Sequence, residues 1–299
     1  MRMDSFTLRQ VNSPKRLMMV FPHPDDESFG PGGTIARYAA EGAAVHFVCA
    51  TRGEAGTVKP ELLKSVEHLP EDKRLGALRE AELRCASAQL GLTGLHFLGY
   101  RDSGMTPTAD PRAFVNANPD EVVGALVQLI RQIRPQVLVT FDPFGGYGHP
   151  DHIFIHHRTT EAFYAAADPK RYPEAGAPYQ PQKLYWSTFP KRWLKIVLRL
   201  MALLGKDPSK FGRNGDIDLR QMAAYDYPVT TKIDIWPYYS IKADASACHV
   251  SQDGSAMQLK GWPNAAKRRI IGYELFTRVE PALNGRRDIE SDLFEGVDE

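Results

Sequence analysis

The chain has 299 residues, 43% of them hydrophobic, and can therefore bury a large core as one α/β domain or as a domain with an appended lobe. Lys and Arg number 37 against 36 Asp and Glu, a balance that argues against general nucleic-acid binding, which needs a basic surplus on one face. The three cysteines lie far apart, which argues against a disulfide framework and favours a reducing compartment, with Cys49 and Cys85 as small core residues. The amino terminus lacks an apolar signal core, and no apolar run approaches the roughly 20 residues of a membrane span, so we expect a cytoplasmic protein.

The first predicted unit spans residues 16 to 42. Arg16 to Phe21 is a short apolar run bounded by prolines, which predicts a strand covered on both faces. His-Pro-Asp-Asp-Glu follows at 23 to 27, and then a glycine-rich turn and the start of a helix. Charge placed directly after a buried strand is costly unless a metal or a reaction uses it, so we expect a ligand site at this strand end.

Strands and helices then alternate along the chain. The pattern predicts a second strand at 43–50, a loop with one short helix at 55–71, a helix at 72–90 ended by Gly91, a third strand at 95–100, a helix at 120–133, a fourth strand at 136–141 and a helix at 153–167. Such alternation predicts an α/β fold, a Rossmann-like doubly wound and mainly parallel sheet with helices on both faces. Right-handed crossovers allow the strand order 3-2-1-4, which places the first strand beside the fourth.

The carboxyl-terminal part is predicted to be a smaller elaboration of the same single domain, at about residues 183 to 285, on a core at about 16 to 168. It contains predicted strands at 183–189 and 229–236 and predicted helices at 191–204 and 238–252. The helix at 191–204 is basic and amphipathic, as in membrane-surface helices. We favour packing on its own protein or at a contact in a homo-oligomer. The acidic tail at 288–299 is expected to fray.

A metal site is the chemistry that these clusters favour. Imidazole and carboxylate three residues apart, as in His23 and Asp26, can reach one ion from a single turn, and a catalytic zinc site needs three protein ligands. The third is expected from GGYGHPDH at 145–152, which follows the fourth strand. A rival pair, His152 with His156, has HxxxH spacing but lacks the glutamate of HExxH and would leave the first cluster without a task.

An ordered set of motifs makes a family resemblance specific. HPDDE with GG after it, TRGE at 51–54, REAEL at 79–83, YRDSGM at 100–105, YG before HPDH, and KADASACHVSQ at 242–252 resemble the LmbE/PIG-L family of zinc-dependent N-acetylglucosamine deacetylases. The resemblance covers most of residues 16 to 252. Pro22 before the histidine and Pro31 within the glycine turn depart from the common pattern, although neither removes a ligand.

The resemblance implies roles for the residues of the two clusters. It implies a zinc ion, with ferrous iron as the alternative, bound by His23, Asp26 and His152. It assigns the general base to Asp25, and because adjacent side chains point in different directions, one aspartate can bind the metal while the other transfers a proton. Tyr147 is similar in position to a family tyrosine that stabilises the oxyanion.

The remaining implied roles concern the leaving group and the sugar. His149 is expected to stabilise charge or to donate to the leaving amine, oriented by Asp151. Arg79 and Asp102 match family positions that hold sugar hydroxyls, although Arg79 alone would indicate a surface ion pair with Glu82. Two further substrate-binding candidates lie in family-like motifs: Glu54 in TRGE and His249 in HVSQ.

The function that the resemblance implies is hydrolysis of the acetamide of an N-acetylglucosamine moiety on a small aglycone. Inositol and malate, the aglycones of the mycothiol and bacillithiol pathways of low-molecular-weight thiol biosynthesis, both stay open. The expected partner is this small-molecule substrate, with no nucleic acid and no integral membrane segment. Alternatives are a deacetylase of an oligosaccharide or antibiotic precursor, a metallopeptidase, and a non-catalytic nucleotide-binding module, against which no GxGxxG or GxxxxGKS loop follows any predicted strand.

Overall fold

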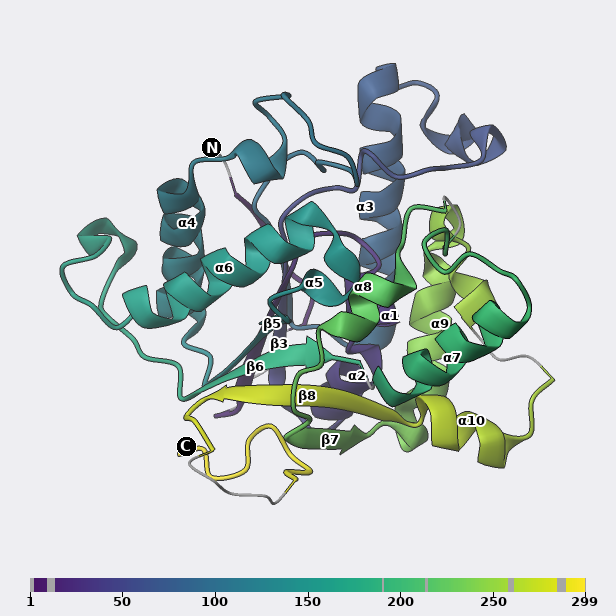
Figure 1. The fold of residues 1–299 in the computed structure, drawn as a ribbon. Coiled ribbons are helices and arrows are strands. Elements are labelled where there is room, and N and C mark those ends of the chain that lie inside the picture. The colour runs from purple at the N-terminus through teal and green to yellow at the C-terminus, as the bar shows by residue number, and fades with distance from the viewer. Residues whose placement is uncertain are drawn as a thin grey trace.

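The computed structural model describes residues 3–9, 14–189, 191–212, 215–257, 261–283 and 289–298. One mixed sheet of eight strands lies at its centre, in the order β1-β4-β3-β2-β5-β6-β8-β7 (Figure 1). The strands are β1 (Asp4–Thr7), β2 (Arg16–Phe21), β3 (Ala44–Cys49), β4 (Gly94–Phe97), β5 (Val137–Phe141), β6 (Lys183–Thr188), β7 (Thr231–Asp234) and β8 (Tyr273–Glu280).

The inner strands run parallel and the outer ones do not. β4, β3, β2, β5 and β6 pair in parallel, whereas β1 joins β4, β8 joins β6 and β7 joins β8 in antiparallel pairs. The predicted order of the first four strands is confirmed, because β2 lies between β3 and β5. The strand order therefore reverses between β2 and β5, where open α/β sheets bind ligands at the carboxyl ends.

Helices cover both faces of this sheet. They are α1 (Asp26–Phe29), α2 (Gly32–Ala40), α3 (Glu71–Leu90), α4 (Pro119–Ile133), α5 (Gly145–Gly148), α6 (Pro150–Ala165), α7 (Lys191–Leu203), α8 (Leu219–Ala224), α9 (Tyr239–Cys248) and α10 (Asn264–Ile271), with a 3-10 helix at Pro60–Val66 in the loop before α3. α2, α3 and α9 contact one another, and α4 packs on α6. Figure 1 shows α4 and α6 on one side of the sheet and α3 with α9 on the other, the doubly wound arrangement that the alternation predicted.

The core is built from the parallel strands. Every residue from Leu17 to Phe21 in β2 and from Val137 to Val139 in β5 is completely buried. Strands covered on both faces read as continuous apolar runs, which explains why the sequence predicted them. Two strands outside the parallel part of the sheet were not predicted: β1, where half-buried and exposed positions alternate, and β8, where charged residues interrupt the apolar ones.

Two expectations for the outer parts of the chain are wrong. The tail does not fray as a whole, because Glu290, Leu293 and Phe294 are buried against the sheet. Two of the cysteines are paired rather than free: Cys85 in α3 and Cys248 at the end of α9 form a disulfide, with 5.9 Å between their Cα atoms. Their separation of 163 residues hid the pair, since only the packing of α3 against α9 brings them together.

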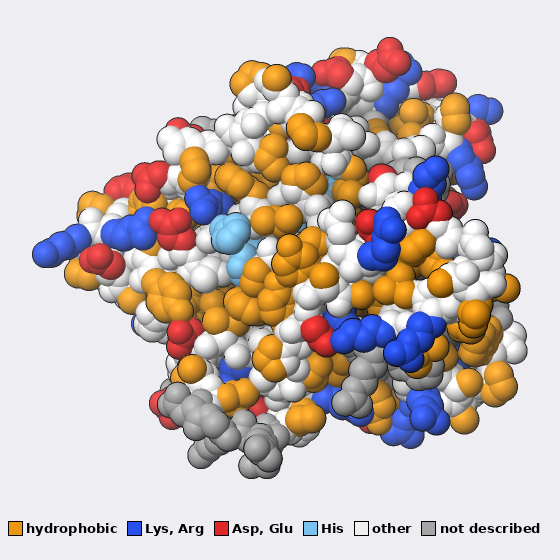
Figure 2. All heavy atoms as spheres, viewed as in Figure 1, with side chains coloured by type: hydrophobic (Ala, Val, Ile, Leu, Met, Phe, Trp, Pro, Cys, Tyr) orange, Lys and Arg blue, Asp and Glu red, His pale blue; other side chains and the backbone are white. Residues whose placement is uncertain are grey.

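The predicted basic amphipathic helix is α7. Its exposed apolar side chains include Ile196, Leu200 and Leu203, and Figure 2 shows hydrophobic side chains beside Lys and Arg over this part of the molecule. α7 packs on α8, which agrees with packing on its own protein. Among the described helices, none has both the length and the apolar composition that a membrane crossing requires.

Candidate active site

The predicted site residues meet where the carboxyl ends of β2 and β5 lie side by side. Met19 of β2 is in register with Val139 of β5, so the turns that follow the two strands are neighbours. A pocket of about 280 Å³ opens there. Six of the predicted residues are among those that line it: His23, Asp25, Arg79, Asp102, Tyr147 and His149.

Three donor groups converge beneath this pocket. His23 lies in the turn after β2, Asp26 begins α1, and His152 lies in the first turn of α6. The His23 Nδ1 is 3.1 Å from the His152 Nε2. The Asp26 carboxylate oxygens lie 3.8 Å from the same atom of His23 and 3.7 Å from that of His152. The fold therefore brings the three residues named as ligands together.

The surroundings fix which nitrogen of each ring is free. The Nδ1 of His152 is 3.1 Å from the carbonyl oxygen of Gly145, so it carries the proton and donates it there. The Nε2 of His23 is 3.1 Å from the Asp151 carboxylate and donates to it in the same way. The two remaining nitrogens face each other with their lone pairs, an arrangement that repels unless a cation or a proton lies between them. Two imidazoles, a carboxylate and an outer carboxylate on one imidazole fit a divalent metal.

The pKa shifts of these three residues also favour a cation at this site. Burial raises the pKa of Asp26 to about 8, even though the charge of His23 opposes the shift. Burial lowers the pKa of His23, but the negative charges of Asp102, Asp151 and Asp26 outweigh it and leave that pKa well above its usual range. Burial, with the charges of the neighbouring histidines, holds the pKa of His152 well below its usual range. The metal-free site thus keeps a proton on His23, which a divalent cation would displace.

Other donor combinations exist among the described residues. His23 with His149 and His152, and His23 with Asp102 and Asp151, each bring ligand atoms within 4.8 Å of one another. Both share His23, so a cation anywhere in this cluster would contact it. His149 and Asp102, one from each set, already have hydrogen-bond partners. The Nδ1 of His149 accepts from the Asp151 backbone N–H, and the Asp102 carboxylate accepts from the Gly104 N–H.

Asp25 forms part of the pocket wall in an unusual backbone conformation. Its φ is 110°, a region that non-glycine residues rarely adopt and that costs about 1–3 kcal/mol. Its carboxylate Oδ2 is 3.0 Å from the Nη2 of Arg79. Burial raises the pKa of the Asp25 carboxyl, and the guanidinium opposes that shift. The first aspartate of the motif is therefore turned away from Asp26 and paired with a buried guanidinium.

The second cluster contains one relation that the sequence predicted wrongly. The Asp151 carboxylate was expected to orient His149, but its Oδ2 contacts His23 and accepts from the Ser103 N–H at 3.0 Å. α6 begins at Pro150, so Asp151 lies in the first helical turn and only its backbone N–H bonds to His149. Tyr147 lines the pocket, and its hydroxyl lies 3.5 Å from the Nε2 of His152.

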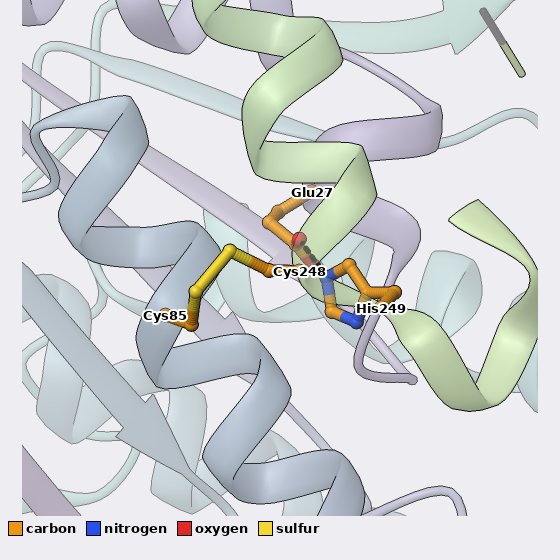
Figure 3. Close-up of a disulfide and its surroundings, with 4 residues drawn as sticks. All are labelled: Glu27, Cys85, Cys248 and His249. Carbon is orange, nitrogen blue, oxygen red and sulfur yellow. Dashed lines mark hydrogen bonds and ion pairs between the residues drawn. A yellow bond between two sulfur atoms is a disulfide. The ribbon is translucent and has the colours of Figure 1, made fainter. Parts of the chain in front are cut away.

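The predicted sugar-binding residues divide into two groups. Arg79 and Asp102 line the pocket, with the Nη1 of Arg79 4.0 Å from the Asp102 Oδ2. Glu54 lines a separate surface groove and accepts hydrogen bonds from the backbone N–H groups of Asp102 and Arg52. His249 is completely buried, with its Nε2 2.6 Å from the Glu27 carboxylate (Figure 3).

Sequence reasoning gave no role to several residues of this site. Asp216 and Ile217, from the segment between α7 and α8, line the pocket, and so does Gln252. No local sequence pattern marks Asp216 and Ile217, because their place at the pocket depends on how the segment between α7 and α8 packs. Glu27 was visible as the last residue of HPDDE, but its buried partner lies 222 residues away.

Comparison with known proteins places the chain among sugar deacetylases by sequence similarity. The family model PIG-L, described as GlcNAc-PI de-N-acetylase, matches residues 18–163. The 1D-myo-inositol 2-acetamido-2-deoxy-alpha-D-glucopyranoside deacetylase of Streptomyces scabiei is 41% identical over 302 residues, which cover 94% of this chain and 90% of that protein.

Solved structures show the same fold at lower identity. The N,N'-diacetylchitobiose deacetylase from Pyrococcus horikoshii has a TM-score of 0.62 at 21% identity, over 92% of this chain and 86% of that one. The 4-carboxy-2-hydroxymuconate hydratase from Pseudomonas putida KT2440 has a TM-score of 0.60 at 20% identity, over 91% of this chain and 99% of that one. Since the two are named for different reactions, the fold alone does not fix the chemistry. The near-full-length relative decides the family: this chain belongs to the PIG-L (LmbE) family.

Proposed function

We propose that this protein is a metal-dependent hydrolase that removes the acetyl group from the 2-acetamido-glucosyl unit of an N-acetylglucosaminyl-inositol. The observation that carries the proposal is the convergence of the His23 Nδ1, the His152 Nε2 and the Asp26 carboxylate below a pocket of sugar size. The relative from Streptomyces scabiei, matched over nearly its whole length, supports the choice of substrate.

The three converging residues would hold the cation, zinc or ferrous iron. When bound, such an ion supplies a Lewis acid that polarises an amide carbonyl and lowers the pKa of water from 15.7 to about 7. The protein's part is to orient the donors and to set which ring nitrogen of each histidine faces the ion. Gly145 and Asp151 do this by accepting the N–H of each imidazole, and the backbone N–H of His23 holds the Asp26 carboxylate at 2.9 Å.

Asp25 takes the proton from the attacking water. Its carboxylate lies at the pocket wall, and Arg79 both orients it and favours its ionised form. Attack of the water oxygen on the acetamide carbon forms a C–O bond, and cleavage of the C–N bond then releases acetate. The proton held by Asp25 goes to the departing nitrogen, so the sugar leaves as a free amine.

Tyr147 and His149 would stabilise the negative charge that develops on the carbonyl oxygen. Burial lowers the pKa of His149 to about 4, so its ring is neutral at cellular pH. Because its Nδ1 accepts from the Asp151 N–H, the single ring proton is on Nε2. His149 is therefore a hydrogen-bond donor in the pocket wall rather than a base, and Tyr147 offers a second donor from its phenol.

Amine release by the purified protein, paired with elemental analysis, tests the proposal. The substrate panel contains N-acetylglucosaminyl-inositol, N-acetylglucosaminyl-malate, free N-acetylglucosamine and N,N'-diacetylchitobiose. We expect about one metal ion per chain and fastest release from the inositol conjugate. Preference for malate would move the assignment to the other thiol pathway, and release from the chitobiose alone to an oligosaccharide deacetylase. No release from any N-acetyl sugar would overturn the proposed function.

The paired variants Asp25→Ala and Asp26→Ala separate the two roles. Asp26→Ala removes a carboxylate between two histidines and should lose the metal. Asp25→Ala leaves these donors intact and should keep the metal, while kcat falls by about 10²–10⁴-fold through loss of the base. If both variants retain the metal, the ligand assignment is wrong.

A further inference from the structure

A buried acid and base beside the pocket have no role in the reaction described above. Glu27 in α1 and His249 after α9 are both completely buried, and the Glu27 Oε1 lies 2.6 Å from the His249 Nε2. Figure 3 shows the two side chains facing each other, joined by a dashed line. His249 does not reach the pocket, which argues against direct contact with the sugar.

The second oxygen of Glu27 connects this pair to the general base. Its Oε2 accepts a hydrogen bond from the backbone N–H of Asp25 at 2.9 Å. On the other side of the same peptide unit, the carbonyl oxygen of Pro24 accepts from the Nη2 of Arg79 at 2.6 Å. The peptide that precedes Asp25 is thus held at both its N–H and its C=O.

This support matters because the backbone at Asp25 is strained. A φ of 110° is unfavourable for a residue with a Cβ, and such a conformation persists only where surrounding contacts over-determine it. Releasing the N–H would let the peptide rotate, and the Asp25 carboxylate would then leave its contact with Arg79.

The position of His249 is itself fixed from α3. The disulfide joins Cys248, the preceding residue, to Cys85. Three residues before Cys85 on the same helix, the Glu82 carboxylate accepts from both the N–H and the hydroxyl of Ser251, at 2.7 and 2.6 Å. The helix that carries Arg79 therefore also holds the segment that carries His249, and Figure 3 shows the disulfide beside the buried pair.

We propose that Glu27 and His249 are positioning residues that hold Asp25 in its catalytic conformation, and that the Cys85–Cys248 disulfide keeps His249 in place for this task. This inference rests on the proposed function, since it assigns Asp25 as the base. It gives the disulfide a consequence for turnover: reducing it frees the end of α9, and kcat falls while the donor cluster for the metal stays complete.

Variants of the buried pair test the positioning role. Glu27→Gln keeps the size of the side chain but weakens its hold on His249 and on the Asp25 N–H. We expect kcat to fall about 10²-fold, since a shift of about 1 Å in a catalytic group has that effect. KM should change less than about threefold, and metal content should stay at the wild-type level. His249→Gln, which retains an N–H donor toward Glu27, should keep more activity than His249→Leu.

A buried ion pair elsewhere provides the matched control. Lys183 and Glu290 are both buried and lie 2.9 Å apart at the amino end of β6, whereas the pocket is at the carboxyl ends of the strands. Glu290→Gln should lower the melting temperature as Glu27→Gln does, without changing kcat. Equal effects of the two substitutions on kcat would mean that Glu27 acts only through general stability, and would overturn the proposal.

Reduction tests the part played by the disulfide. Cys85 is exposed and Cys248 is half-buried, so a phosphine reductant can reach the bond. The S–S bond breaks as the phosphine supplies two electrons and is oxidised to its oxide, and water supplies the two protons for the thiols. We expect kcat of the wild type to fall to the value of the Cys85→Ser variant, and the variant itself not to respond. An unchanged kcat after complete reduction, verified by thiol titration, would contradict this part.

The crystal structure of Glu27→Gln separates failure of this inference from failure of the proposed function. If Asp25 keeps its φ near 110° and its contact with Arg79 in that variant, Glu27 does not position it, whatever reaction the protein catalyses. If the wild type releases no amine while Asp25 moves in the variant, the positioning is upheld and the deacetylase assignment fails.

Discussion

Substitution of Gly53, which lies outside the pocket, should impair catalysis within it. Gly53 follows β3 with a φ of +68°, and a Cβ built on it would lie 2.1 Å from the Nη1 and 2.3 Å from the Cζ of Arg79. Arg79 is 4% exposed and donates to the carbonyl oxygens of Gly53 and Pro24, so its guanidinium can move away from the new Cβ only by giving up hydrogen bonds that now hold it. Gly53→Ala therefore forces Arg79 away from Asp25.

The cost has two parts that a second glycine can separate. An alanine in the left-handed region costs about 1–2 kcal/mol, and losing one hydrogen bond of a charged group costs about 1.5–3 kcal/mol more. Gly42 has a φ of +88° with nothing within 4 Å of its Cβ position, so Gly42→Ala carries only the first cost. We expect Gly53→Ala to be destabilised by about 3 kcal/mol or more and Gly42→Ala by about 1 kcal/mol.

Calorimetric melting and steady-state amine release measure both effects. Gly53→Ala should lose about 10²-fold in kcat with its metal retained, because a displaced Arg79 no longer orients the base. Gly42→Ala should have wild-type kcat and KM. If the two variants melt alike and turn over alike, Arg79 is not held as the structure shows, and the argument that it orients Asp25 fails.

Two further predictions concern single groups. Tyr147→Phe should keep the metal and a KM near that of the wild type while kcat falls about 10²–10³-fold, measured by amine release, because only a donor to the developing oxyanion is lost; an unchanged kcat would remove Tyr147 from the mechanism. His46 and His96, 3.1 Å apart on β3 and β4, each have a pKa lowered by burial from 6.5 to about 4. As the pH falls, the unfolded chain protonates these two histidines before the folded protein does. The stability that the neutral histidines contribute is therefore complete above pH 6.5 and is lost as the pH falls from 6.5 to about 4. The loss is up to about 3 kcal/mol for each histidine. Urea unfolding at pH 7.5 and pH 5 should show this loss in the wild type and less of it in His46→Leu/His96→Leu; equal losses would contradict it.

The centre of the fold could be predicted from the sequence because its signals are local. The apolar runs of β2 and β5 mark buried parallel strands, and the handedness of crossovers then leaves few orders for them. Once the two strands are neighbours, the clusters that follow them must meet. The convergence of His23, Asp26 and His152 thus follows from topology together with residue type.

The rest depended on contacts that no local pattern records. The Asp151 carboxylate contacts His23 rather than the predicted His149 because α6 starts one residue before Asp151. The position of a helix boundary decides where a side chain next to it points. Glu54 lies in a family-like motif, yet its carboxylate accepts backbone N–H groups across two loops. The disulfide and the Glu27–His249 pair both join segments more than 160 residues apart.

An anomalous difference map at the zinc absorption edge, from crystals grown with zinc, tests the central claim most directly. The account predicts one peak per chain in the space shared by the His23 Nδ1, the His152 Nε2 and the Asp26 carboxylate, with His149 and Asp102 outside bonding distance. A peak bound instead by His149 or by the Asp102 and Asp151 carboxylates, or no peak in this cluster, would contradict it.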